Sequence, residues 1–225
     1  MSIQIMGKFN NAITNVDGTA YNALTVTFRP IDYGLLGMFR VAALSGTMTA
    51  GLGAASDIFQ SRWTDASRIA LIWAVSLDGM GGSSTVFTAG FANFSVFVAR
   101  NWTADGTGGT VMTPVAESQS LRTNMGSSIM GTVRGPTTGA LGIGTRTLDT
   151  QAIGQITCSI GVNANVNYII RTINLFGVRR GIGAGSLRQP LVLAYNEGLV
   201  VQATVPATGT WQVGVSMFWS EVGIY

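Results

Sequence analysis

The amino-acid sequence predicts an all-β fold, an antiparallel two-sheet sandwich that is jelly-roll-like. In much of the chain apolar residues recur at every second position, which is the side-chain alternation of a half-buried strand. Clusters rich in Gly, Asp and Pro separate these runs, as at residues 78–83, 105–109 and 206–209, and such clusters form tight reversals. Helical periodicity is hard to find. Strands of this kind, about nine or ten in number, close most simply into two packed sheets.

The chain is predicted to contain one main domain. Residues 1–20 are rich in Asn, Thr and Gly and weakly patterned, so we interpret them either as an arm that reaches onto a neighbouring subunit or as a frayed terminus. Residues 21–225 are predicted to form a single β-sandwich domain. A chain of this length can bury one substantial core, and the sequence shows no dividing linker and no internal repeat.

The expected strands follow in chain order. Alternation predicts the first of them at residues 24–28 and 39–43. The clearest early run is residues 68–77, where the odd positions from 69 to 77 are apolar, and the clearest late run is residues 211–219. Further strands are predicted between these two runs, at residues 94–98, 156–160 and 199–205. The faces expected to be largely buried carry Ile69, Leu71, Trp73, Val75, Trp211, Val213 and Val215.

The composition indicates a protein that is covered by neighbours. Charged residues are 10% of the chain, against about 25% in ordinary globular proteins, which is too little to coat a normal monomer surface. The formal net charge is +3, and Lys8 is the only lysine. Arginine forms bidentate pairs at protein interfaces, so this bias suits an interaction protein. The arginines are scattered singly apart from Arg179 and Arg180, which argues against nucleic-acid binding.

The sequence lacks most of the chemistry of enzymes. Histidine is absent, which excludes Ser-His-Asp and Cys-His catalysis and His-ligated metal sites. Cys158 is the only cysteine, so a structural zinc site is excluded, and its phase with Ile156 and Ile160 predicts a small core residue. The loop at Asp105 could hold calcium, but it lacks the spaced oxygen ligands of an EF-hand, and a structural turn is favoured. We expect no catalytic residue, no metal and no cofactor.

Two groups of residues are candidates for a subunit interface. Phe97 and Phe218 lie on the polar faces of the uncharged runs 79–99 and 198–220. Arg179, Arg180 and Arg188 flank a glycine-rich segment that fits neither the dinucleotide-binding fingerprint nor the Walker pattern. These arginines could meet acidic patches on a partner, or they could be solvated side chains on a loop.

Trp102 is the candidate for ligand stacking. It follows Arg100 and Asn101 and precedes the glycine-rich loop at residues 105–109, which makes it the tryptophan to test for stacking on a ligand. Tryptophans in phase with aliphatic residues, such as Trp73, are instead expected in the core or at an interface.

The sequence predicts neither secretion nor membrane insertion. The N-terminal segment has no basic region followed by an apolar one, so we expect a protein made in the cytoplasm. The long uncharged runs are interrupted by Ser, Thr, Asn, Gly and Pro206, whereas a spanning helix needs about 20 predominantly apolar residues.

The sequence resembles virion structural proteins of tailed bacteriophages. The resemblance is carried by residues 189–201 and 206–211 and by the closing segment 219–222. It extends upstream to residues 59–63, 121–123 and 144–149, and thus spans most of the chain. It implies a component of the head or tail surface in a virion made in the host cytoplasm, with other virion proteins as partners. It carries no catalytic residues that could be transferred.

We therefore expect a non-enzymatic virion structural protein that self-assembles, most simply as a trimer or a ring, and decorates or cements the head or builds the tail surface. Two alternatives remain. A carbohydrate-binding adhesin module of a tail fibre would show an exposed aromatic cluster around Trp102. A glycan depolymerase would need two carboxylates within about 5 to 10 Å of each other in a groove.

Overall fold

The computed structural model describes residues 3–6, 13–16, 37–49, 52, 54–82, 89–113, 126–160, 173–177 and 190–223. The chain divides into two compact units, Met1–Asp32 and Tyr33–Tyr225. In the first unit, β1 (Ile3–Met6) pairs antiparallel with β2 (Ile13–Val16). The second unit holds all the other strands, and it is the unit discussed below.

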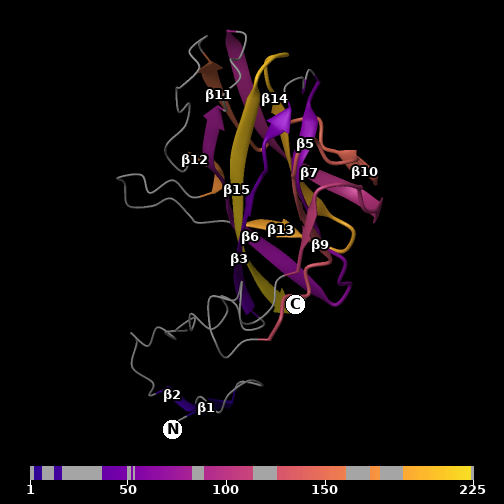
Figure 1. Ribbon diagram of the computed structural model, residues 1–225. Helices are drawn as coiled ribbons and strands as arrows, with labels where there is room; N and C mark the ends of the chain where they lie inside the picture. The colour runs from indigo at the N-terminus through magenta and orange to yellow at the C-terminus, as the bar shows by residue number, and fades with distance from the viewer. Residues whose placement is uncertain are drawn as a thin grey trace. The chain divides into compact units, whose positions relative to one another are not determined.

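The second unit is a sandwich of two antiparallel sheets, which confirms the predicted fold class (Figure 1). In the part of the chain that the structure describes, every regular element is a strand. The six-stranded sheet contains β3 (Gly37–Leu44), β4 (Met48–Thr49), β6 (Arg68–Gly82), β12 (Ile173–Gly177), β13 (Leu191–Leu193) and β15 (Thr210–Gly223). The seven-stranded sheet contains β5 (Ser56–Arg62), β7 (Gly90–Ala104), β8 (Thr110–Met112), β9 (Thr132–Gly135), β10 (Thr145–Leu148), β11 (Gly154–Ile160) and β14 (Gly198–Thr204).

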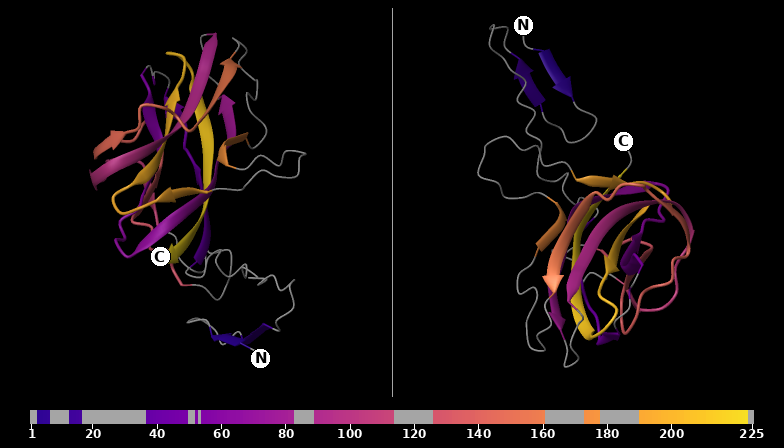
Figure 2. Two further views of the ribbon diagram at one scale, coloured as in Figure 1. Left: turned by 180° about the vertical axis from the view of Figure 1, so that it is seen from behind. Right: turned by 90° about the horizontal axis from the view of Figure 1, so that it is seen from above.

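The strand order identifies the sandwich as jelly-roll-like. The longest strands of the first sheet lie in the order β12-β6-β15-β3, and those of the second in the order β11-β7-β14-β5. Each of the two sheets therefore interleaves early and late strands, and β14 and β15 from the end of the chain lie inside their sheets. This interleaving is the double Greek key of jelly rolls. Figure 2 shows the two sheets facing each other from two further directions.

The core lies between the two sheets and is rich in aromatic rings. Phe39 stacks on Trp219 with ring centroids 5.5 Å apart. Phe94 meets Trp211 edge to face at 6.3 Å. All four side chains are fully buried, and rings packed this way add about 0.5–1.5 kcal/mol per pair beyond their area burial.

The burial prediction is right for the three β15 residues and wrong for three of the four β6 residues. Trp211, Val213 and Val215 are buried as predicted, and so is Val75. The residues that are only half-buried are Ile69, Leu71 and Trp73. In their place Ala70 and Ile72 face the core.

A β-bulge explains this inverted phase. Trp219 pairs with Ile72 and Phe218 pairs with Ala74, so β6 has one more residue than β15 at this point, Trp73. An extra residue moves every side chain before it to the opposite face relative to those after it. The indole N–H of Trp73 donates a hydrogen bond to Ser220 Oγ at 2.9 Å instead of entering the core.

An insertion between β7 and β11 covers part of the outer face of the seven-stranded sheet. It contributes β8 and β9, which extend the sheet beyond β5, and β10, which pairs with β7. We call residues 136–148, which follow β9 and include β10, the strap. The strap runs antiparallel to β5 at the Asp57–Leu141 bridge and ends on the opposite side of β14.

Candidate functional site

Trp102, the predicted stacking residue, is buried. Its relative exposure is 1%, and the guanidinium group of Arg146 lies 4.6 Å from the ring centroid. The indole N–H donates to the carbonyl oxygen of Ala104 at 3.0 Å, and the ring packs in a small cluster with Ala99 and Val200. Stacking on a ligand requires an accessible face, so the structure does not support Trp102 as the ligand-stacking candidate. The reason is the strap, which brings Arg146 over the ring.

The predicted interface residues are partly placed by the structure. Phe97 on β7 and Phe218 on β15 are both half-buried. Their role at an interface stays a prediction. Arg179, Arg180 and Arg188 lie outside the described residues.

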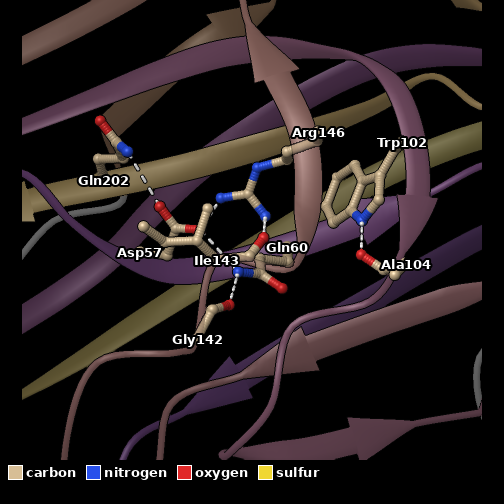
Figure 3. A network of polar contacts seen from close by, with 8 residues as sticks. All are labelled: Asp57, Gln60, Trp102, Ala104, Gly142, Ile143, Arg146 and Gln202. Atoms are coloured by element: carbon tan, nitrogen blue, oxygen red, sulfur yellow. Dashed lines mark hydrogen bonds and ion pairs between the residues drawn. The ribbon is translucent and has the colours of Figure 1, made fainter.

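The densest polar constellation surrounds a buried ion pair between Asp57 and Arg146. The side chains are 1% and 0% exposed, although Arg146 as a whole is half-buried because its backbone is accessible. Asp57 also accepts hydrogen bonds from the amide groups of Gln60 at 2.6 Å and Gln202 at 3.0 Å. Figure 3 shows Arg146 between the Asp57 carboxylate and the Trp102 ring.

This network fastens the strap to the sheet. Gln60 donates to the carbonyl oxygen of Gly142 at 2.8 Å, and Arg146 donates to the carbonyl oxygen of Ile143. The backbone N–H of Leu141 donates to the carbonyl oxygen of Asp57 at 2.8 Å. The side chains come from β5, β14 and β10, so one polar cluster joins strands far apart in the sequence. We call it the strap clamp: Asp57, Gln60, Arg146 and Gln202.

The chemistry of the strap clamp is structural. Removing one side chain of a buried ion pair leaves the other as an uncompensated charge, which costs about 3–5 kcal/mol of stability. Every member is a neutral amide or half of the ion pair, and none is a nucleophile with an adjacent base. The pair was missed because its members are separated by 89 positions. The available signal was a charged residue inside each of two short alternating runs.

A second polar group anchors the loop at Asp105. The Asp105 carboxylate pairs with Arg62 at 3.1 Å and accepts a hydrogen bond from Thr132 at 2.5 Å. Arg62 also donates to the side chain of Asn196 at 3.1 Å. Protein groups thus engage both oxygens of the carboxylate, and both partners come from strands far from this loop in the sequence.

Arg100 forms an exposed ion-pair cluster. It donates to both oxygens of Asp149 at 2.8 and 3.0 Å and to Glu197 at 2.6 Å. The hydrogen bond from Arg100 lowers the pKa of Asp149, and the charge of Arg100 acts in the same direction. The Arg100 side chain is half exposed, so solvent screens this cluster and it contributes little to stability.

Glu221 on β15 is a fully buried carboxylate. It accepts hydrogen bonds from Ser128 Oγ at 2.5 Å, from Trp219 Nε1 at 3.1 Å and from the backbone N–H of Ile129 at 3.2 Å. Burial raises the pKa of Glu221, and these hydrogen bonds and the charge of Arg68 oppose that rise. Its contacts join the segment before β9 to the six-stranded sheet, so it serves as a second structural anchor.

Cys158 packs against the core as a half-buried residue, and burial raises the pKa of its thiol. Among the described residues, no three His, Cys, Asp or Glu side chains come together in a group that could hold a metal ion. Nor does the described part of the chain contain a helix that is long and apolar enough to cross a membrane.

Beyond the strap clamp, the outer face of the seven-stranded sheet is uncharged along β11 and along residues 91–97 of β7, where Phe91 and Asn93 are exposed. Phe91 is 63% exposed and lies opposite Ser159. Thr157 is exposed and donates to the side chain of Asn93 at 2.8 Å. Gln155 completes the exposed row on β11. This face therefore offers hydroxyl groups, amides and one phenyl ring, with no charge.

In comparisons with known proteins, no protein-family model, no curated protein and no solved structure matches the chain.

Proposed function

We propose that this protein is a non-enzymatic structural subunit of a bacteriophage particle, which assembles with copies of itself and with other virion proteins. The observation that carries the proposal is the uncharged, exposed face of β7 and β11, with Phe91 63% exposed. A low-charge face with an exposed aromatic residue is typical of a surface that is covered on assembly.

The polar chemistry inside the fold supports the same proposal. The strap clamp, the Arg62–Asp105 pair and Glu221 each join segments of the chain to one another. Jelly rolls occur in viral capsid proteins and also in lectins, so the fold supports an assembly role by analogy only.

Native mass spectrometry and light scattering of the purified chain at micromolar concentration test self-assembly. We expect a mass that is a multiple of 23.6 kDa, as a trimer or a ring would give. Antibodies against the chain should label intact particles of the phage that encodes it. A monomer in solution together with unlabelled particles would contradict the proposal.

Glycan binding is the second candidate function, and one observation favours it. Phe91 is an exposed ring with Asn93 on the same strand face, which is a combination that can stack on a sugar and hydrogen-bond its hydroxyl groups. A glycan array separates the two candidates. Specific binding that is lost in Phe91→Ala would favour the adhesin, whereas self-assembly without glycan binding would favour the structural subunit.

A further inference from the structure

The edges of the two sheets differ in how well they are protected. An edge strand exposes unpaired backbone groups, and proteins usually guard it by shortness, charge, proline or a bulge. β3 carries the exposed Arg40, and β8 has 3 residues. β11 has 7 residues, contains neither a charge nor a proline, and pairs with β7 without any register shift. Within the described ranges, no strand pairs with its other edge (Figure 1).

We propose that β11 of one subunit pairs antiparallel with β11 of a second copy across a twofold axis. The contact would join the seven-stranded sheets of the two copies into one continuous sheet. This inference rests on the proposed self-assembly and names a surface that carries it. A twofold contact uses the same residues on both sides, so it also fits as a link between trimers or rings.

The absence of charge favours a second copy over a different partner. In a pair of β11 strands related by a twofold axis, each residue opposes either its own counterpart or another residue of β11 in the other copy. A charge on the axis or next to it would then lie close to its own copy, and like charges directly opposite each other destabilise a sheet. A strand that is uncharged over its whole length meets this requirement.

The strand itself selects the register. A twofold axis normal to the sheet leaves each side chain on the same face of the sheet in both copies. Residues directly opposite each other in an antiparallel pair also have their side chains on the same face. The axis must therefore pass between a residue and the same residue of the other copy. Thr157 is the midpoint of Gly154–Ile160, so only the register centred on Thr157 pairs the whole strand with itself. Gln155 would then oppose Ser159 of the other copy.

The side chains in this register are compatible on both faces. On the exposed face, Thr157 opposes Thr157 and Gln155 opposes Ser159, which are uncharged pairs able to hydrogen-bond. On the core side, the half-buried Ile156 and Cys158 would cover each other. Phe91 lies one strand inward beside Ser159 and would add apolar area to the contact.

A charge on the axis tests the contact. Thr157→Lys places two ammonium groups opposite each other, so we expect the species linked through β11 to fall to half its mass in native mass spectrometry and sedimentation velocity. Thr110→Lys is the matched control, because Thr110 is an exposed threonine on β8, and its assembly should equal that of the unmodified chain. Circular dichroism of both variants checks that the fold is retained.

A covalent trap tests the register independently of stability. In a Cys158→Ser background, Thr157→Cys should form a disulfide-linked dimer under mild oxidation, because directly opposed Cβ atoms lie about 4.5–5.5 Å apart. Thr110→Cys in the same background should not. An assembled chain whose mass is unchanged by Thr157→Lys, and whose Thr157→Cys variant is not trapped, would overturn the β11 contact and leave the proposed self-assembly standing. A monomeric unmodified chain, together with a Thr157→Cys variant that gives no trapped dimer, would overturn both.

Discussion

At the scale of single residues, the protein uses its few charges for internal fastening. Asp57 and Arg146 form an ion pair with almost no exposed area, and the Arg146 guanidinium also covers the Trp102 ring. Arginine suits this position because its planar group can pair with a carboxylate and stack on an aromatic ring at once. The exposed Arg100 cluster contains the same kinds of groups, yet solvent screens it. Burial therefore decides which pair matters for stability.

Arg146→Ala should lower the free energy of unfolding by about 3–5 kcal/mol, because Asp57 would be left as a buried, unpaired charge. Urea denaturation measures the change. Arg100→Ala is the control, and we expect it to cost about 1 kcal/mol or less. Equal costs for the two variants would show that the strap clamp does not have the role assigned to it.

Glu221 should make stability depend on pH. Burial raises the pKa of Glu221 in the folded protein above its ordinary value of 4.5, so the folded protein takes up a proton before the unfolded chain does as the pH falls. The contribution of Glu221 therefore becomes more favourable as the pH falls through the folded pKa, and the penalty is fully present above it.

Denaturation of the unmodified chain and of Glu221→Gln at several pH values tests this sign. Relative to the variant, the unmodified chain should gain stability from neutral pH down toward 4.5, because the glutamine does not titrate. The difference cancels the opposite effect of Asp149, whose pKa is lowered. A difference that is constant over this range would refute the assignment.

At the scale of elements, β-bulges and the strap determine which side chains reach the core. In β6 the extra residue Trp73 inverts the alternation, so the faces before and after it differ. Bulges are local accommodations between two paired strands, and they let a long strand follow the twist of the sandwich. The strap adds a second layer on the outer face, where it covers Trp102 and Asp57.

A pair of neighbouring substitutions in β6 tests the bulge. Ile72 is fully buried whereas Leu71 is half-buried, so Ile72→Ala should cost about 2–5 kcal/mol and Leu71→Ala clearly less. The uninterrupted alternation of the sequence predicts the reverse order. Chemical denaturation of the two variants under the same conditions decides between the two faces.

The close approach of the strap to the loop after β7 requires a glycine at position 106. A Cβ atom on Gly106 would lie 1.9 Å from the carbonyl oxygen of Gly142, so Gly106→Ala must displace the backbone of the strap. We expect a loss of about 1–3 kcal/mol and faster proteolysis of the strap. Gly139→Ala is the matched control within the strap, since a Cβ atom there would meet nothing within 4 Å. A destabilised Gly139→Ala with an unaffected Gly106→Ala would show that the packing is different.

At the scale of the whole molecule, the charged side chains are unevenly distributed: they form ion pairs near the strap, whereas the outer face near β11 carries none. Under the strap, Asp57 and Arg146 form a buried ion pair, while the face formed by β11 and residues 91–97 of β7 is uncharged. Exposed apolar residues such as Phe91 are ordinary when isolated, but one beside an unprotected edge strand marks a surface that neighbours can cover. The low overall charge of the chain is consistent with that use.

Phe91→Asp should reduce the assembled mass without changing the free energy of unfolding of the isolated subunit, because the side chain is exposed. Charged substitutions of the half-buried Phe97 and Phe218 should act in the same direction. Val192→Asp is the control, because Val192 is 48% exposed and lies on β13, a strand that carries none of these phenylalanines. Light scattering at several concentrations measures the effect. An unchanged mass for Phe91→Asp would exclude this face from the assembly.

The sequence by itself determined the all-β class, the jelly-roll-like sandwich and the buried face of β15. These features depend on the alternation of apolar residues and on turn residues. Both are properties of short segments, so they can be read from the sequence without knowing how the strands are arranged. Cys158 was also placed correctly against the core by its phase alone. The same reasoning was sufficient for Val75 but not for the first half of β6.

Only the tertiary structure decided the phase of Ile69, Leu71 and Trp73, the burial of Trp102 and the pairing of Asp57 with Arg146. The bulge at Trp73 exists because of how β15 lies beside β6, which no pattern within β6 encodes. Trp102 is buried because the strap, which follows it by dozens of residues, returns to lie over it. Periodicity reports which face of a strand is apolar, whereas register and the partner of a buried charge depend on contacts between segments far apart in the chain.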